Sequence, residues 1–247
     1  GKDVFDGEQT GTGAFDFTNV TKDLTINITA GGAQGSSGNN FIAFQSPIPY
    51  ITDIKGGSGN DVVTIAATGT SAVTVDGGTG GDQYLVSFGR LNTAIQINDT
   101  GLGLLDSDTV AIQPLSRDYL LSVGDQYVSG AKAGLGEQRA NFTNGIENLT
   151  VDAKSNGGSL IQIAEPISFA GDVKLLARQS IIDNTIDSGN LRIESTLGVN
   201  IAADVNAHAN GNVTVLVNGG DITVTEDVMS SAGSGFTGDG GGLVHLF

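Results

Sequence analysis

The sequence predicts an all-β fold, specifically a β-solenoid of the parallel β-helix or β-roll kind, with coils of about 18–26 residues. Three observations lead to this prediction. Short segments of alternating apolar and polar residues recur along the whole chain. A glycine-rich segment returns at a fixed spacing. The chain has 38 glycines, no tryptophan and only 6% aromatic residues, so Val, Ile, Leu and Ala must form a thin core.

The glycine-rich segment occurs three times, and its copies start at positions 35, 56 and 77, so the spacing is the same both times. The copies begin Gly35-Ser-Ser-Gly-Asn-Asn40, Gly56-Gly-Ser-Gly-Asn-Asp61 and Gly77-Gly-Thr-Gly-Gly-Asp82. Each is followed by an apolar, strand-forming stretch. A fixed period of this length is typical of stacked supersecondary units, so each copy is predicted to be a turn that leads into a strand.

Stacked turns of this composition would present many oxygen atoms to one another. Neighbouring strands lie about 4.8 Å apart, so carbonyl and carboxylate groups of adjacent turns converge. Calcium prefers six to eight oxygen ligands. The predicted calcium ligands are Asp61 and Asp82, with Asn40 and Asp108 in the adjoining turns, and backbone carbonyls near Gly57, Gly59, Gly78 and Gly80. The alternative is that Asp, Asn and Gly are there only because they suit turns.

The copies resemble the RTX (hemolysin-type) calcium-binding repeat, Gly-Gly-x-Gly-x-Asp-x-U-x, in which U is a large apolar residue. The resemblance implies Ca²⁺ as the bound ion and secretion from a bacterial cell. In this chain the first copy has Ser36 and Asn40 where the repeat has glycine and aspartate. The spacing of the copies is also wider than the nine-residue RTX period, which implies RTX-like turns within a wider coil.

Strands are predicted from the beginning of the chain onward, in the order of the alternating segments. They cover residues 14–17, 24–28, 41–44, 50–54, 62–65, 84–88, 94–97, 109–112, 119–123, 126–129, 145–151 and 160–163. Asp108 follows Asp82 at a wider spacing than Asp82 follows Asp61, which predicts an insertion of about five residues in that coil. Residues 130–140 are predicted to be an excursion loop. No helix longer than a turn is expected.

From about residue 166 the pattern changes, so the predicted domains are 1–165, with calcium turns, and 166–247, which continues the solenoid without them. The later strands begin with Gly171-Asp-Val173, Gly189-Asn-Leu191, Gly211-Asn-Val213 and Gly242-Leu243. This variable spacing resembles the β-helix of filamentous-hemagglutinin-type adhesins. Residues 230–242 are predicted to form a lateral loop.

A wider resemblance covers roughly residues 5–165. Asp16-Phe-Thr-Asn-Val-Thr, Asp76-Gly-Gly and Gly145-Ile-Glu-Asn-Leu-Thr-Val-Asp152 look like segments of giant repetitive bacterial surface proteins. It implies that the chain is a segment of a larger extracellular or cell-surface protein.

The charge balance limits the partners that can be expected. The formal net charge is −16, with 27 acidic and 11 basic residues, which disfavours a nucleic-acid partner. No apolar run is long enough to span a membrane. Without cysteine there is no disulfide and no thiol chemistry. The expected partners are neighbouring copies or adjoining segments of the same protein, or cell-surface glycans.

The sequence favours a non-catalytic role, because no nucleophile elbow or zinc-protease motif is present. We expect a structural or adhesive segment that acts as a rigid stalk or as a self-assembling surface-layer or filament unit. The alternative is a carbohydrate-active β-helix enzyme or carbohydrate-binding module. Its candidate residues would be Asp183, Asp187 and Glu194 with Arg178 or Arg192.

Overall fold

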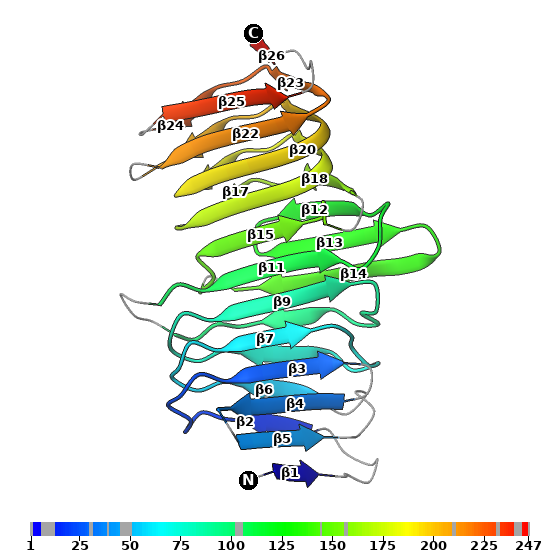
Figure 1. Ribbon diagram of the computed structural model, residues 1–247, viewed down its shortest axis with the longest axis vertical. Coiled ribbons are helices and arrows are strands. Elements are labelled where there is room, and N and C mark those ends of the chain that lie inside the picture. Colours follow the sequence, from blue (N-terminus) through cyan, green and yellow to red (C-terminus); the bar gives the residue numbers. More distant parts are fainter. Residues whose placement is uncertain are drawn as a thin grey trace. The chain divides into compact units, whose positions relative to one another are not determined.

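The computed structural model describes residues 2–5, 13–29, 32–38, 40–44, 51–101, 106–143, 145–155, 158–208, 211–230, 233–239 and 244–246. These residues form strands and turns and include no helix, as predicted (Figure 1). A helix capable of crossing a membrane is accordingly not found among them. The chain divides into two compact units, which are residues 1–111 with 138–146 (unit 1) and residues 112–137 with 147–247 (unit 2).

The strands of unit 1 are short and close to the predicted positions. They are β1 Lys2–Phe5, β2 Gly13–Asp16, β3 Thr25–Thr29, β4 Gly32–Ser37, β5 Asn40–Phe44, β6 Ile51–Lys55, β7 Val62–Ile65, β8 Val73–Asp76, β9 Gln83–Phe88 and β10 Ile95–Ile97. β11 (Thr109–Pro114) and β14 (Leu135–Phe142) each have residues in both units.

In unit 1 the chain passes alternately through two rows of parallel strands. β3, β7 and β9 pair in one row, and β6, β8 and β10 pair in the other (Figure 1). Val62 pairs with Gln83, which confirms for this coil the step predicted from the second and third glycine-rich copies. Ile95 pairs with Val73 in the second row, where the step is nearly the same. Inward side chains such as Val63 are fully buried, so each row contributes one apolar face to the core.

One prediction for unit 1 is wrong, because the first glycine-rich copy does not form the turn that precedes the second. Gly35 lies within β4, which pairs in antiparallel fashion with both β3 and β5. Thr25 of β3 pairs directly with Val62 of β7. Many more residues therefore separate the paired positions of these two coils than separate those of the next two coils. The additional residues include the inserted antiparallel strands.

The strands of unit 2 include the two longest strands in the described part of the chain. The strands that lie wholly within this unit are β12 Leu120–Gly124, β13 Tyr127–Lys132, β15 Asn148–Asp152, β16 Leu160–Ile163, β17 Ile167–Ser168, β18 Asp172–Ile182, β19 Ile186–Ser188, β20 Asn190–Ile201, β21 Val205–Ala207, β22 Asn212–Asn218, β23 Asp221–Val224, β24 Val228–Ser230, β25 Gly233–Asp239 and β26 Val244–Leu246.

Unit 2 also consists mainly of parallel rows. β15, β18, β20, β22 and β25 pair successively, and the second halves of β18 and β20 pair with β16 and β23 (Figure 1). A third, separate row contains β17, β19, β21 and β24. The strands predicted after Gly171, Gly189 and Gly211 are confirmed. Their buried residues Val173, Leu191 and Val213 are partners in consecutive strands.

The predictions of two loops, at residues 130–140 and 230–242, are wrong. Residues 130–140 contain the end of β13 and much of β14, and residues 233–239 form β25, which pairs with β22. Both segments are rich in glycine and small residues, so their composition indicated a loop, whereas a neighbouring strand supplies the pairing partner. Leu243 lies outside the described residues, and its neighbour Val244 pairs with Ile222 of another row.

The fold is thus all-β and dominated by parallel strands in regular register, which is compatible with a β-solenoid. The predicted domain boundary at residues 165 and 166 stays a prediction. Strands on either side of it, β16 and β18, pair with each other.

Candidate metal centre

Three aspartates occupy the same position in consecutive turns of unit 1. Asp61, Asp82 and Asp108 are each fully buried directly before a strand. The Asp82 carboxylate accepts the backbone N–H of Asp61 at 2.7 Å, and the Asp108 carboxylate accepts that of Asp82 at 2.7 Å. The Asp61 carboxylate accepts the N–H of Leu24 at 2.8 Å. We call this row the aspartate ladder, because each member holds the backbone of the preceding turn.

The glycines of the repeat allow the turns to approach closely. A Cβ atom on Gly57 would collide with the Val20 carbonyl oxygen, and one on Gly78 would collide with the Gly57 carbonyl oxygen. Gly78 also has a φ of +99°, which favours glycine. Any side chain at these two positions would separate the turns and break the ladder.

Three carboxylates of unit 1 meet at one point. Asp82, Asp99 and Asp108 each place an oxygen within 4.8 Å of the others, and all three residues are buried. This group is the aspartate cluster. Asp106 lies beside it, where its carboxylate accepts the N–H of Gly80 at 3.2 Å.

At least one oxygen atom of the aspartate cluster is buried without a hydrogen bond among the described residues. Asp82 uses Oδ1 for the N–H of Asp61, and its Oδ2 has no partner among the described residues. The Oδ2 atom of Asp106 is also buried without a hydrogen bond among the described residues. A buried carboxylate oxygen without a donor is destabilising unless a proton or a cation compensates its charge. The donor set consists of oxygen atoms, which suits a hard divalent cation, so the cluster could hold a metal ion.

Tyr84 fixes the position of Asp99. Its hydroxyl donates to Asp99 Oδ2 at 2.6 Å and accepts the backbone N–H of Gly77 at 2.6 Å. Burial, followed by the negative charge of Asp99, raises the pKa of Tyr84. The phenol therefore stays protonated and acts as a donor, which leaves the other oxygen of Asp99 to accept the N–H of Gly101 at 2.8 Å.

All three carboxylates of the aspartate cluster have raised pKa values. Burial, and then the neighbouring charges of Asp61, Asp99 and Asp106, raises the pKa of Asp82 from 3.8 to about 7. Burial also raises the pKa of Asp99 and of Asp108. Neither Asp82 nor Asp99 has an ion pair with Lys or Arg among the described residues. The cluster therefore attracts either protons or a cation.

The other predicted ligands lie in different surroundings. Asp61 also accepts the N–H of Gly57 at 3.0 Å, so both of its oxygens bind backbone groups. The Gly57 carbonyl accepts the N–H of Thr79 at 3.0 Å. The carbonyl oxygens of Gly59 and Gly78 lie against the Cα atoms of Gly80 and Gly101, respectively, where a Cβ would collide with them.

Asn40 is not placed in the turn below Asp61. It begins β5 and pairs with Ser37 across a hairpin, and its side chain lies outside the described residues. Leu24 occupies the position that Asn40 was predicted to take. Of the predicted residues, the structure therefore brings Asp82 and Asp108 together in the cluster.

Sequence reasoning missed Asp99 and did not single out Asp106. A repeated pattern could have identified Asp99. Asp76-Gly-Gly78 and Asp99-Thr-Gly101 form equivalent turns, in which the carboxylate accepts the N–H two residues later. These turns follow β8 and β10, which are parallel neighbours.

Unit 2 has a related arrangement with asparagine, in which each side chain accepts a backbone N–H of the following coil instead of the preceding one. Asn148 accepts the backbone N–H of Asp172 at 2.9 Å, and Asn190 accepts that of Asn212 at 2.9 Å. These residues are exposed or half-buried, and the amide side chain carries no charge. Among the described residues of unit 2, no group of three or more metal-ligating side chains comes together.

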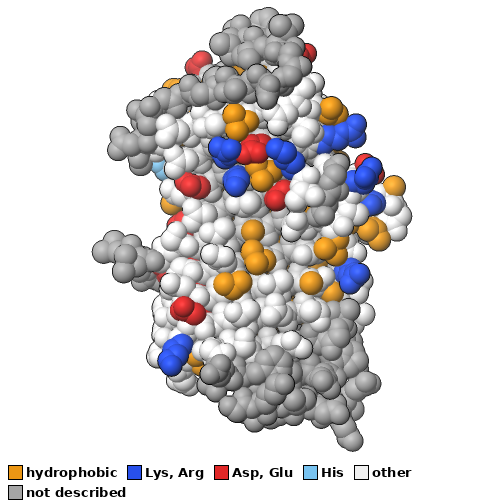
Figure 2. All heavy atoms as spheres, in the orientation of Figure 1, with side chains coloured by type: hydrophobic (Ala, Val, Ile, Leu, Met, Phe, Trp, Pro, Cys, Tyr) orange, Lys and Arg blue, Asp and Glu red, His pale blue; other side chains and the backbone are white. Residues whose placement is uncertain are grey.

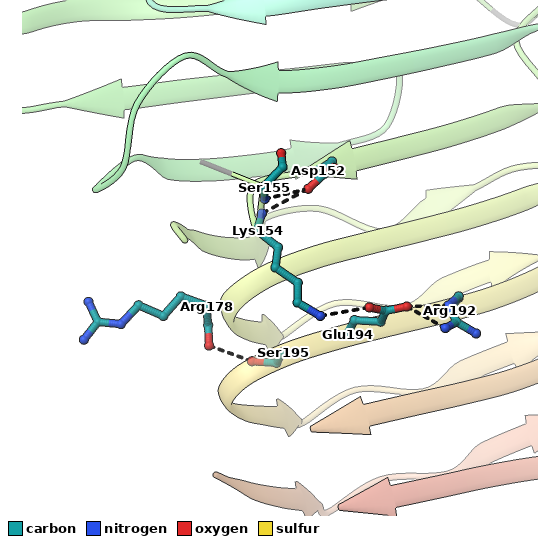
Figure 3. Close-up of polar contacts among 7 residues, drawn as sticks. All are labelled: Asp152, Lys154, Ser155, Arg178, Arg192, Glu194 and Ser195. Carbon is teal, nitrogen blue, oxygen red and sulfur yellow. Dashed lines mark hydrogen bonds and ion pairs between the residues drawn. The ribbon is translucent and has the colours of Figure 1, made fainter. Parts of the chain in front are cut away.

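The candidate residues of the carbohydrate-active alternative are dispersed in unit 2. Glu194 lies between Lys154 and Arg192, with an Nζ–Oε2 distance of 3.0 Å and an Nε–Oε1 distance of 2.7 Å (Figure 3). Asp187 lies in the separate row on β19, 3.7 Å from His208, and Asp183 accepts from Gln162. Glu194 is therefore held in a local ion-pair group and does not converge with the other two carboxylates.

No family model matches this chain, and neither the curated proteins nor the solved structures compared with it give a match.

Proposed function

We propose that this chain is a calcium-stabilised β-solenoid segment of a large extracellular bacterial surface protein, with a structural or adhesive rather than a catalytic role. The observation that carries the proposal is the aspartate cluster. It places three buried carboxylates together and leaves Asp82 Oδ2 without a partner among the described residues. It also includes Asp82 and Asp108 of the turns that were predicted to bind calcium.

The solenoid is supported by the register of the strands. In unit 1, corresponding residues recur at a nearly constant spacing along the chain and pair in parallel. In unit 2, long parallel strands begin at a recurring Gly-Asx pair. Both are typical of coils that contact only their neighbours, and such coils form stalks or assembling units.

The proposed action of calcium is physical. Asp82, Asp99 and Asp108 would hold the ion, with Asp106 beside them, and the ion would compensate their charge. Metal binding free energy then contributes to folding free energy. The segment would fold fully after export to a calcium-rich exterior, where it would contact neighbouring copies or adjoining segments.

The test is thermal unfolding, followed by circular dichroism, with millimolar calcium and after removal of metal. We expect calcium to raise the melting temperature of the unaltered chain and to have little effect on Asp99→Asn. Asp53→Asn is the matched control, because it removes an exposed carboxylate of unit 1 that is outside the cluster. Equal melting temperatures with and without calcium would contradict the proposal.

A further inference from the structure

A pocket of about 380 Å³ opens at one corner of unit 2. Residues 118–120 before and in β12, residues 158–160 at the start of β16, Arg178 and Gln179 in β18, and Leu197 in β20 line it. A volume of this size is at the lower end of the range for small-molecule sites. All its described lining residues belong to unit 2, so it is separate from the aspartate cluster.

The chain leaves regular β geometry where it forms this pocket. The pairing of β18 with β20 shifts between Ala177 and Gln179, where Arg178 of β18 stands opposite two residues of β20, Thr196 and Leu197. Ser195 Oγ donates to the Arg178 carbonyl at 2.7 Å and holds the irregularity in place (Figure 3). Bulges of this kind redirect a side chain and are frequent next to functional sites.

Backbone strain occurs at the same corner. Asp118 has a φ of +69°, which is uncommon for a residue with a side chain. Gly158 has a φ of +88°, and a Cβ there would lie 2.6 Å from the Cβ of Arg178. Such strain concentrates at ligand sites, because the surrounding structure must stabilise it. The glycine therefore leaves room around the base of the arginine.

The side chains offer one cationic group and an apolar wall. Arg178 is exposed, its side chain points away from the Glu194 ion-pair group in Figure 3, and it has no ion pair among the described residues. Leu120 and Leu197 are 40% and 49% exposed at positions where this chain mostly places polar residues. Gln179 and Asp118 add an amide and a carboxylate.

We propose that this pocket binds a carboxylated sugar, such as a uronic acid unit of an acidic polysaccharide. The guanidinium of Arg178 would pair with the sugar carboxylate. The leucines would pack against the apolar face of the ring, and Asp118 and Gln179 would bind its hydroxyl groups. Because the chain has a net charge of −16, long-range attraction does not favour an anion. Recognition would have to come from these local contacts.

The inference rests on the adhesive part of the proposed function and not on calcium. Figure 2 shows a group of Lys and Arg side chains gathered around an acidic group on one face. Lys154 and Arg192 bind Glu194 (Figure 3), and Lys174 pairs in register with Arg192 on the neighbouring strand. Lys174 therefore provides a matched cation outside the pocket.

The experiment is a calorimetric titration of the whole chain with a trimer of galacturonic acid and with the neutral trimer of galactose. We expect the acidic trimer to bind more tightly than the neutral one. Arg178→Gln should weaken the acidic trimer about tenfold or more, as for loss of a charge-assisted pair. Lys174→Gln should leave the affinity nearly unchanged. Leu197→Asn provides a second variant, which should weaken binding without a change of charge.

Three results would overturn the inference. They are the absence of binding, equal affinity for the neutral trimer, and equal weakening by Lys174→Gln and Arg178→Gln, which would indicate diffuse electrostatic attraction. Each titration is repeated without metal. Binding that persists while calcium leaves the melting temperature unchanged would support this pocket and contradict only the calcium proposal.

Discussion

At the scale of single residues, Asp61 and Asp82 differ although the repeat makes them equivalent. Both are fully buried, and both hold the backbone of the preceding turn. Asp61 also accepts the N–H of Gly57, whereas Gly78, the counterpart of Gly57, donates to Asp76 instead. The second oxygen of Asp82 is thereby left without a hydrogen bond from any residue that the structure describes. The orientation of one N–H group thus separates a structural aspartate from a candidate metal ligand.

The raised pKa of Asp82 predicts how pH changes the stability of the metal-free chain. The pKa is about 7 in the folded state against the ordinary value of 3.8, so the folded state binds more protons than the unfolded state between these values. The free energy of unfolding must therefore fall as the pH rises through this window. We expect a lower melting temperature at about pH 8 than at about pH 5 in metal-free buffer.

Asp82→Asn provides the control for this prediction. The amide keeps an oxygen for the N–H of Asp61 but does not titrate, so the fall in melting temperature should become smaller. Calcium should also reduce the fall, because the ion replaces the protons. A melting temperature that rises between these pH values in metal-free buffer would refute the assignment of a raised pKa.

Substitution of three glycines distinguishes the cost of a positive φ from the cost of a steric collision. Gly78 has a positive φ and a neighbouring carbonyl, Gly38 has a positive φ and open space, and Gly136 has neither constraint. We expect Gly78→Ala to lower the free energy of unfolding by about 3 kcal/mol. Gly38→Ala should cost about 1 kcal/mol, and Gly136→Ala should be neutral or slightly stabilising. Urea unfolding of the three variants measures this order, and equal effects would contradict it.

At the scale of elements, both units connect successive strands by the same device. A side-chain oxygen at, or directly before, the start of a strand accepts the backbone N–H of the equivalent residue in the neighbouring coil. The donor lies in the preceding coil in unit 1 and in the following coil in unit 2. Unit 1 uses buried aspartate for this purpose, and unit 2 uses exposed or half-buried asparagine. These hydrogen bonds have similar lengths. Losing a buried bond of unit 1 should nevertheless cost more free energy of unfolding than losing an exposed bond of unit 2.

Substitution of one aspartate in unit 1 and one asparagine in unit 2 should reveal that difference in free energy. Asp61→Ala leaves the buried N–H groups of Leu24 and Gly57 without an acceptor, so it should lower the free energy of unfolding by about 2–4 kcal/mol. Asn190→Ala releases the N–H of the exposed Asn212, which water can satisfy, so it should cost less than about 1 kcal/mol. Chemical denaturation of both variants provides the measurement. A larger loss for Asn190→Ala would argue against the role of burial.

At the scale of the whole molecule, the two units differ in the charge of their interior. Unit 1 contains the aspartate cluster, whereas the described residues of unit 2 contain no comparable group of buried acids. A cation should therefore stabilise the two units unequally, because it stabilises only the state that binds it.

Hydrogen exchange measured by mass spectrometry tests this expectation. With calcium, peptides from residues 51–101 should exchange more slowly than without metal. Peptides from residues 158–208 should exchange at the same rate in both conditions, because they contain no residue of the cluster. Equal protection of both stretches would mean that calcium acts on the chain as a whole, and protection of neither would mean that the cluster binds no calcium under these conditions.

The sequence by itself determined the local elements. Alternation placed β7 and β16 at the observed bounds, because a half-buried strand requires an apolar residue at every second position. The spacing of the second and third copies predicted the step from Val62 to Gln83, since equivalent turns must lie one coil apart. The sequence also placed Asp82 and Asp108 in turns directly before strands, where the structure has them.

Only the tertiary structure decided which distant segments meet. The antiparallel insertion of β4 moved the first copy out of the row, although its sequence resembles the other two. Asp99 reached the cluster because β10 lies beside β8 and because Tyr84 holds its carboxylate, neither of which is encoded in local spacing. Local patterns reflect burial along one strand, whereas a site depends on the register between strands, and an insertion can change that register without changing the pattern.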